Sequence, residues 1–131
     1  MIINLTQHPA SPEQIAQGVK NLHGDELAEL KALLTIGELP SPDEIRDRAY
    51  DIAALVSSNG LGDDEEDPFF THAMIGGAPY LMPSLERALR DVSVIPLYAF
   101  TRREAIEALQ PDGTVRKTAV FRHLGFVEGV V

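Results

Sequence analysis

The sequence predicts a single α/β domain: a Rossmann-like three-layer sandwich with a mainly parallel sheet of five or so strands and an antiparallel C-terminal strand. Short apolar runs rich in β-branched residues alternate with amphipathic segments along the chain. Two of these segments open with the same helix-start signal, "SPEQ" and "SPDE". A length of 131 residues is enough for one hydrophobic core, so residues 1–131 are expected to form one domain.

The first 23 residues predict a strand and then a helix. Residues 2–5, "IINL", form an apolar run typical of a buried strand. In "SPEQIAQGVKNL", Ser11 is placed as the N-cap, Pro12 at the first helical position and Gln14 as the third member of a capping box. Apolar residues spaced four and three apart give this helix one core face and extend it to residue 22: Ile15, Val19 and Leu22.

Residues 25–57 contain one ambiguous segment and one clear helix. Leucines at 27, 30, 33 and 34 fit a helix, whereas "ALLTI" fits a strand stopped by a glycine and a proline. We expect a short helical turn that leads into a strand at about residues 31–36. The second helix is predicted from Pro42 to about Ser57, with Ser41 as its cap and Glu44 closing the capping box.

The middle of the chain predicts a loop, a strand and a third helix. Five consecutive acidic residues, 63–67, are typical of a solvated loop, and they lack the ligand spacing of a calcium-binding loop. Residues 69–75 form a buried strand in this interpretation. Residues 80–92 form an amphipathic helix in which Pro83 must fall in the first turn, where its missing N–H is harmless.

The last third predicts two more strands. Residues 94–100, "VIPLYAF", are apolar and β-branched enough for the fourth parallel strand. Residues 101–113 are interpreted as a connection that holds a helical turn and ends in the turn signal Pro-Asp-Gly. The final strand is expected at about residues 114–122, antiparallel to the rest of the sheet.

Composition and charge exclude several classes of protein. Cysteine is absent, which rules out disulfides and cysteine-based zinc sites. No apolar run approaches the roughly 20 residues of a membrane span, and the N-terminus does not resemble a signal peptide, so a cytoplasmic protein without membrane contact is expected. The net charge of −9 divides into −11 over residues 1–86 and +2 over residues 87–131. Duplex nucleic acid is therefore not an expected partner, although a small anionic ligand at a local basic site is compatible with the charge.

Candidate site residues follow from the position of the predicted strand ends. In an open parallel sheet, ligands bind outside the carboxyl ends of the strands, near the switch point of the topology. The residues this rule selects as ligand-binding are Thr6, Gln7, Gly76, Gly77, Tyr80, Thr101 and Arg103. His8 and Arg102, in the same loops, are the candidate catalytic residues, because an imidazole transfers protons near neutrality and an arginine fork matches a phosphate.

Each of these features also has a purely structural interpretation. Gly76-Gly77 is either an anion cradle before a helix N-terminus or only a tight strand-to-helix corner, since the GxGxxG and P-loop fingerprints are both absent. The Arg102-Arg103 pair either binds phosphate or pairs with nearby glutamates. No HxxxH, HxH or HExxH spacing occurs, so neither a metal nor another cofactor is expected.

The C-terminal half contains the most distinctive sequence segments: "GGAPYLMPSLERAL", "IPLYAFTRRE" and "DGTVRKTAVFRHLGFVE". It resembles small CRISPR-associated Rossmann-like accessory proteins, the stand-alone relatives of the CARF domain that include ring nucleases. The resemblance implies a homodimer that holds a cyclic oligoadenylate at the carboxyl ends of its strands. It also implies metal-independent cleavage, in which a ribose 2′-hydroxyl attacks its own phosphate, with Gly76, Gly77, Arg102, Arg103 and His8 lining the site.

Three functions remain open at the level of sequence. The first is a nucleotide-binding protein, whose catalytic form is a phosphodiesterase that acts on a cyclic oligonucleotide. The second is a non-enzymatic interaction module, with a phage or mobile element as its source, which would show an exposed apolar patch instead of a concave basic site. The third is a small sugar-phosphate or nucleoside enzyme that directs His8 or Glu38 into a pocket. The fold alone does not choose among them.

Overall fold

A computed structural model describes residues 1–60 and 70–129, and it shows an α/β fold around a five-stranded mixed sheet. The first part of the chain forms β1 (Ile2–Leu5), α1 (Pro12–Ala16), β2 (Val19–Asn21) and α2 (Gly24–Leu34). The second part forms α3 (Pro42–Gly60), β3 (His72–Ile75), α4 (Met82–Asp91), β4 (Ile95–Leu109) and β5 (Val115–Glu128). The acidic run at 63–67, predicted to be a loop, lies outside the described residues.

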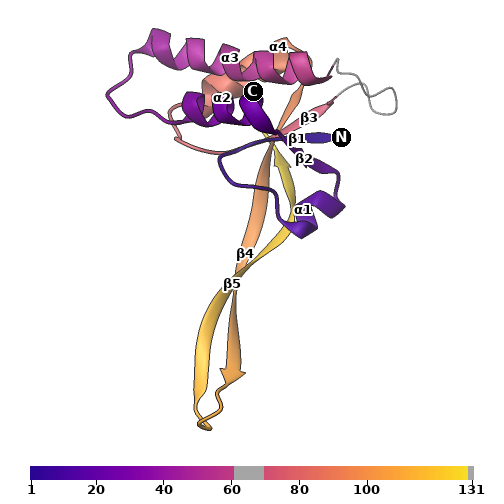
Figure 1. The fold of residues 1–131 in the computed structure, drawn as a ribbon, viewed down its shortest axis with the longest axis vertical. Helices are drawn as coiled ribbons and strands as arrows, with labels where there is room; N and C mark the ends of the chain where they lie inside the picture. The colour runs from indigo at the N-terminus through magenta and orange to yellow at the C-terminus, as the bar shows by residue number, and fades with distance from the viewer. Residues whose placement is uncertain (61–69, 130–131) are drawn as a thin grey trace.

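The sheet has the order β2-β1-β3-β4-β5. The first four strands are parallel and β5 is antiparallel to β4, which confirms the predicted mixed sheet with an antiparallel C-terminal strand. Figure 1 shows α2, α3 and α4 gathered on one side of the sheet and α1 on the other, as right-handed crossovers require. The side of α1 carries only that five-residue helix.

The hydrophobic core fills the space between the sheet and α2, α3 and α4. Alternate residues of β1 and β3 point into it, and these are Ile3, Leu5, Ala73 and Ile75. Among the residues contributed by the helices, Leu30, Ile52, Leu85 and Leu89 are completely buried, as is Leu81 at the N-cap of α4. Each fully buried leucine stabilises the fold by about 1.5–3 kcal/mol relative to an exposed one.

The predicted first helix is much shorter in the structure than in the sequence analysis. Its start is confirmed in full: Ser11 Oγ accepts from Gln14 N at 3.2 Å, and Gln14 Oε1 accepts from Ser11 N at 3.0 Å. The helix ends at Ala16, however, because Gly18 has φ +98°, a conformation that only glycine adopts readily. Val19–Asn21 then form the edge strand β2, so the prediction of a helix to residue 22 was wrong.

The strand predicted at residues 31–36 is also wrong. Residues 24–34 form the helix α2, and its buried residues Leu30 and Leu34 lie one turn apart on the face that meets the core. The helix predicted from Pro42 is confirmed and is extended to Gly60, and Pro83 lies in the first turn of α4 as expected.

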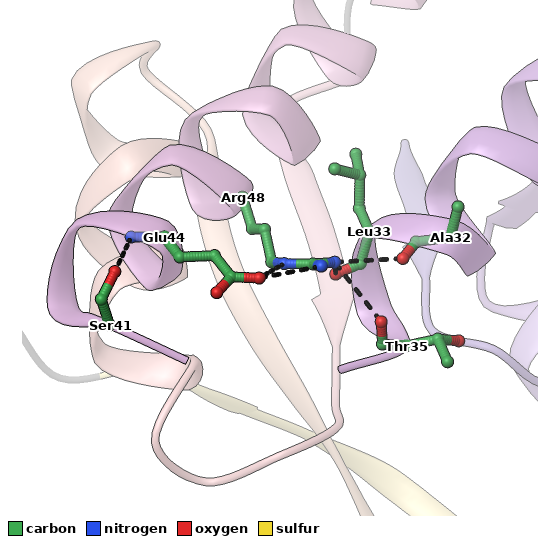
Figure 2. Close-up of polar contacts among 6 residues, drawn as sticks. All are labelled: Ala32, Leu33, Thr35, Ser41, Glu44 and Arg48. Carbon is green, nitrogen blue, oxygen red and sulfur yellow. Dashed lines mark hydrogen bonds and ion pairs between the residues drawn. The ribbon is translucent and has the colours of Figure 1, made fainter. Parts of the chain in front are cut away.

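Arg48 joins α2 to α3 at a point the sequence did not indicate. Figure 2 shows its guanidinium reaching from α3 to the carboxyl end of α2, where Nη1 donates to Ala32 O at 3.1 Å and Leu33 O at 2.9 Å. Its Nε donates to Glu44 Oε1 at 3.1 Å, so the Glu44 carboxylate is paired with Arg48. The Glu44 N–H donates to Ser41 Oγ, which forms the helix cap. A cation at these carbonyls satisfies groups that every helix end leaves open and complements the helix dipole.

The last two strands differ most from expectation. Residues 101–113 were predicted to be a connection with a helical turn, but β4 continues to Leu109 and pairs with β5 from Leu97 to Leu109, with one irregularity between Phe100 and Thr101. The resulting hairpin projects far from the sheet in Figure 1, and its strands wind about each other. We refer to residues 101–123 as the arm. His123, at its base, is buried, and its Nε2 lies 2.9 Å from Gln17 Oε1, which attaches the arm to the segment after α1.

Arg48 provides a direct test of how α2 and α3 are held together. Replacing it by methionine removes the donors but keeps most of the apolar stem, and we expect a loss of about 1–2 kcal/mol in the free energy of unfolding. Urea denaturation would measure this loss. Arg46→Met is the matched control, because Arg46 is on the same helix and its ion pair with Asp43 is exposed; its effect should stay within about 0.5 kcal/mol. Equal losses in both variants would contradict the role of Arg48.

Candidate ligand-binding cavity

A cavity with a volume of about 730 Å³ lies at the carboxyl ends of β1, β3 and β4. This is within the size range of small-molecule sites. In the sheet β2 lies on one side of β1 and β3 on the other, so the strand order reverses direction next to β1. The cavity therefore occupies the switch point of the topology. Its walls come from the loop after β1, the start of α1, the end of α2 and the corner after β3, and include Thr6, Gln7, His8, Pro9, Ser11, Gln14, Leu34, Gly76, Gly77, Ala78, Tyr98 and Ala99.

One buried amide holds the loop after β1 in place. Asn4 is 4% exposed, and its Nδ2 donates to His8 O and to Asn21 Oδ1, both at 2.8 Å. Its Oδ1 accepts from Thr6 N at 2.9 Å and from Thr6 Oγ1 at 2.7 Å. All four hydrogen-bonding positions of the amide are therefore used, which fixes its orientation. Asn21 Oδ1 also accepts from Ala10 N at 3.0 Å, so the same network joins both ends of the loop to β2.

The two glycines form the opposite wall and have different requirements. Gly77 has φ +148°, which disfavours any residue with a Cβ, although a Cβ there would have room, at 3.7 Å from Met82 Cε. Gly76 carries no such constraint, and a Cβ would lie 3.6 Å from Thr6 Cγ2, in ordinary contact. The short distance to Thr6 shows that the two loops meet. Within the described part of the chain, the N–H groups of Gly77 and Ala78 have no hydrogen-bond acceptor.

The surface of the cavity is mainly apolar, with a few polar groups and little charge. No lysine or arginine is among its described lining residues; the polar groups are hydroxyls, the amides of Gln7 and Gln14, and the imidazole of His8. Gln7 Nε2 donates to Thr35 Oγ1 at 3.3 Å, which leaves its carbonyl oxygen free to accept. Burial, together with the charge of Glu86 and a hydrogen bond to it, raises the pKa of Tyr98 to about 12, so its phenol stays protonated at neutral pH.

The structure brings together five of the nine residues predicted from the sequence. Thr6, Gln7 and His8 follow β1, and Gly76 and Gly77 follow β3, all in the lining of the cavity. This convergence was predictable because the carboxyl ends of parallel strands share one edge of the sheet.

The other four predicted residues lie elsewhere. Tyr80 is half exposed and does not line the cavity. The remaining three were expected in a loop at the end of the fourth strand, but β4 continues and carries them into the arm, where Thr101 pairs with His123 and Arg103 with Phe121. Arg102 Nη2 binds Glu104 Oε1 at 2.9 Å, the surface pairing that the sequence analysis had kept as the alternative.

Three residues of the site were missed by sequence reasoning. Asn4 is a polar residue inside the apolar run "IINL", and a buried amide in such a run is itself a signal, because it must find partners. Gln14 was recognised only as a helix cap, and it lines the cavity as well. Tyr98 was assigned to a strand, and nothing in its local sequence indicates that it lies at the rim of a cavity.

Neither a metal centre nor a membrane segment is found in residues 1–60 and 70–129. No group of three or more His, Asp or Glu side chains there could hold a metal ion. No helix in the same residues is long and apolar enough to span a bilayer.

Fold and cavity together define an α/β protein with a small-molecule-sized site at the switch point of its sheet. A family model described as "Uncharacterized protein MJ1673 family" matches residues 1–127, and the chain belongs to that family. Comparison with curated proteins and with solved structures finds no match.

The Asn4 network predicts a graded loss of stability. Asn4→Asp keeps the shape but places an oxygen opposite His8 O and Asn21 Oδ1, and we expect a loss of about 2–3 kcal/mol in the free energy of unfolding. Thr6→Val removes only one donor and should cost about 1 kcal/mol. Urea denaturation gives both values, and faster hydrogen exchange of the Ala10 amide in Asn4→Asp would report the loosened loop. Two variants as stable as the parent would show that the network does not support the cavity.

We expect substitution by alanine to change the free energy of unfolding at one of the two glycines and hardly at the other. Gly77→Ala should lower the free energy of unfolding by about 1–2 kcal/mol, because alanine is strained at φ +148°. Gly76→Ala should change it by less than about 0.5 kcal/mol, since its Cβ meets Thr6 only in ordinary contact. Thermal and urea unfolding of the two variants test this. A larger loss for Gly76→Ala than for Gly77→Ala would overturn the description of the corner.

Proposed function

We propose that this protein binds a nucleotide of low charge in the cavity at the carboxyl ends of β1 and β3. The observation that carries the proposal is the composition of the walls. One part is apolar, formed by Leu34, Met74, Ile75 and Ala99, and suits a flat heterocyclic base. The other part offers the amides of Gln7 and Gln14, which pair with base edges or ribose hydroxyls.

A phosphate group has one suitable place in this cavity. Gly77 and Ala78 line the cavity at the corner that leads to α4, and their N–H groups, which have no acceptor in the described part of the chain, are the donors proposed for it. Because no cationic side chain is among the described lining residues, the site suits a single phosphate group, that of a nucleoside monophosphate or one phosphodiester of a larger nucleotide, rather than the contiguous phosphates of a triphosphate.

Cleavage of a cyclic oligonucleotide is the catalytic form of this proposal. His8 is the lining residue suited to take the proton of a ribose 2′-hydroxyl, whose oxygen attacks the adjacent phosphorus. The bond to the 5′-oxygen breaks, that oxygen takes up a proton, and a 2′,3′-cyclic phosphate remains. Arg102, expected to act beside it, is engaged with Glu104 on the arm, so within one chain His8 acts without it.

A thermal-shift titration with adenosine, AMP, ATP and a cyclic oligoadenylate tests binding. A ligand at about 100 times its dissociation constant stabilises the native state by about 2.7 kcal/mol, which raises Tm by several degrees. We expect the shift with AMP or the cyclic diester to exceed that with ATP. Absence of any shift with all four compounds would overturn the proposal.

Matched variants locate the ligand. Gln7→Ala should weaken binding about tenfold through the loss of one amide contact, whereas Gln110→Ala, at the tip of the arm, should have no effect. Arg102→Ala should also leave the shift unchanged. Strand cleavage with the cyclic compound, lost in His8→Ala with binding retained, would identify the catalytic form; binding without cleavage would leave a ligand-binding module.

The alternative function, a non-enzymatic interaction module, is favoured by a different observation. Large apolar side chains are exposed on the arm, including Leu109 at 76%, Phe121 at 71% and Val115 at 58%. An exposed apolar surface of this kind marks a contact with another macromolecule.

A further inference from the structure

The arm lacks the support that such a hairpin ordinarily requires. Figure 1 shows it standing clear of the helices and of the rest of the sheet, and every residue from 111 to 122 is exposed. A two-stranded hairpin alone in water is marginally stable, and it gains stability when one face packs against another surface. The chemistry of the two faces therefore indicates what the arm packs against.

The two faces differ in composition because paired residues of β4 and β5 point to the same side. One face, here called the arginine face, carries Arg102, Arg116 and Arg122, with Glu104 between Arg102 and Arg122 at 2.9 and 3.5 Å. The opposite face, here called the alanine face, is built from four cross-strand pairs: Arg103 with Phe121, Ala105 with Ala119, Glu107 with Lys117, and Leu109 with Val115.

The alanine face is complementary to itself. Its centre is the Ala105–Ala119 pair, which has no side chain longer than a methyl group and allows a second backbone to approach closely. A two-fold axis that crosses the strands at this pair reverses their direction in the second copy. The Arg103–Phe121 pair of one copy then lies over the Glu107–Lys117 pair of the other, with β4 over β4 and β5 over β5.

This arrangement places complementary chemistry at both levels. Arg103 of one copy faces Glu107 of the other, and Phe121 faces Lys117, an ion pair and a cation–π contact that each occur twice by symmetry. Within the described residues Arg103 has no ion-pair partner of its own, and Glu107 reaches Lys117 only at 3.9 Å. Both charges are therefore available for a contact between copies.

Charge favours a second copy of this chain over a nucleic acid. The arm carries five basic and three acidic side chains, and the remaining residues carry a net charge of −11, which repels a polyanion. On the alanine face the two basic side chains, Arg103 and Lys117, are separated by Glu107 and by apolar side chains, so this face does not present a continuous basic surface to a nucleic acid.

We propose that two copies of this chain associate through their arms, face to face across the Ala105–Ala119 pair, with Arg103 of each copy paired to Glu107 of the other. The twist of the arm limits close contact to the three cross-strand pairs from Arg103–Phe121 to Glu107–Lys117, roughly 14 Å of strand. Six side chains from each copy are far fewer than the roughly 20–30 residues a side of a standard interface. The dimer is therefore weak, with a dissociation constant in the micromolar range, and it does not depend on the ligand of the cavity.

Sedimentation equilibrium of the intact protein over about 1 to 500 µM tests the dimer, with single charge reversals as probes. Arg103→Glu and Glu107→Arg should each weaken self-association about tenfold or more, since each reversal places two like-charged contacts in the dimer. An equimolar mixture of the two variants should restore it, because a mixed dimer has an opposite-charge pair at both contacts. Circular dichroism and thermal unfolding confirm that each variant is folded.

Arg116→Glu is the matched control, since it makes the same change of charge on the arginine face and should leave self-association unchanged. A monomeric parent protein at 500 µM, an equal effect of Arg116→Glu, or a mixture that stays monomeric would each overturn the proposal. So would an arm that binds a nucleic-acid oligonucleotide while the protein remains monomeric.

Discussion

The hydrogen bonds of the Asn4 amide are the constraint on which the rest of this structure depends. A polar side chain in the middle of a buried strand costs stability unless all of its donors and acceptors are used, and here all four are. Two of them reach Thr6, one reaches His8 and one reaches Asn21 in the neighbouring strand. The edge strand β2, the loop after β1 and the wall of the cavity are therefore fixed by a single residue. An apolar residue at this position would suit the strand and leave the loop without its attachment.

How much of the fold the sequence predicts depends on whether local and long-range preferences agree. They agree at Ser11 and Ser41, where the cap, the proline and the apolar stripe all indicate a helix, and both helices begin where expected. They disagree after Ala16: the apolar spacing continues as in a helix, but the positive φ of Gly18 turns the chain so that Val19 joins the sheet. Helical spacing alone cannot detect this, because Val19 is buried in either case.

The arm shows the opposite failure. Glutamate, alanine and leucine in "REAIEAL" have high helix propensity, and the segment was predicted to hold a helical turn. Pairing with β5 overrides that propensity, since each of residues 101–109 gains a cross-strand neighbour that lies 6 to 22 residues away along the chain. The wrong placement of Arg102 and Arg103 at the cavity has the same cause. If the strand ended at residue 100, both arginines would lie in a loop beside Gly77; because the strand continues, they lie on the arm.

The candidate site was more predictable than the elements around it, for a physical reason. The rule for parallel sheets needs only the ends of β1 and β3, and both ends are marked by a change from apolar to polar or glycine residues. The long strand β4 then connects the two features of this protein. Tyr98 and Ala99 line the cavity, and the irregularity between Phe100 and Thr101 separates them from the arm that begins at the next residue. That irregularity lets the arm turn out of the plane of the sheet while the base of β4 stays in register with β3. The His123–Gln17 contact holds the base of the arm on the side of α1, so the geometry of the cavity rim and the direction of the arm are set by the same few residues.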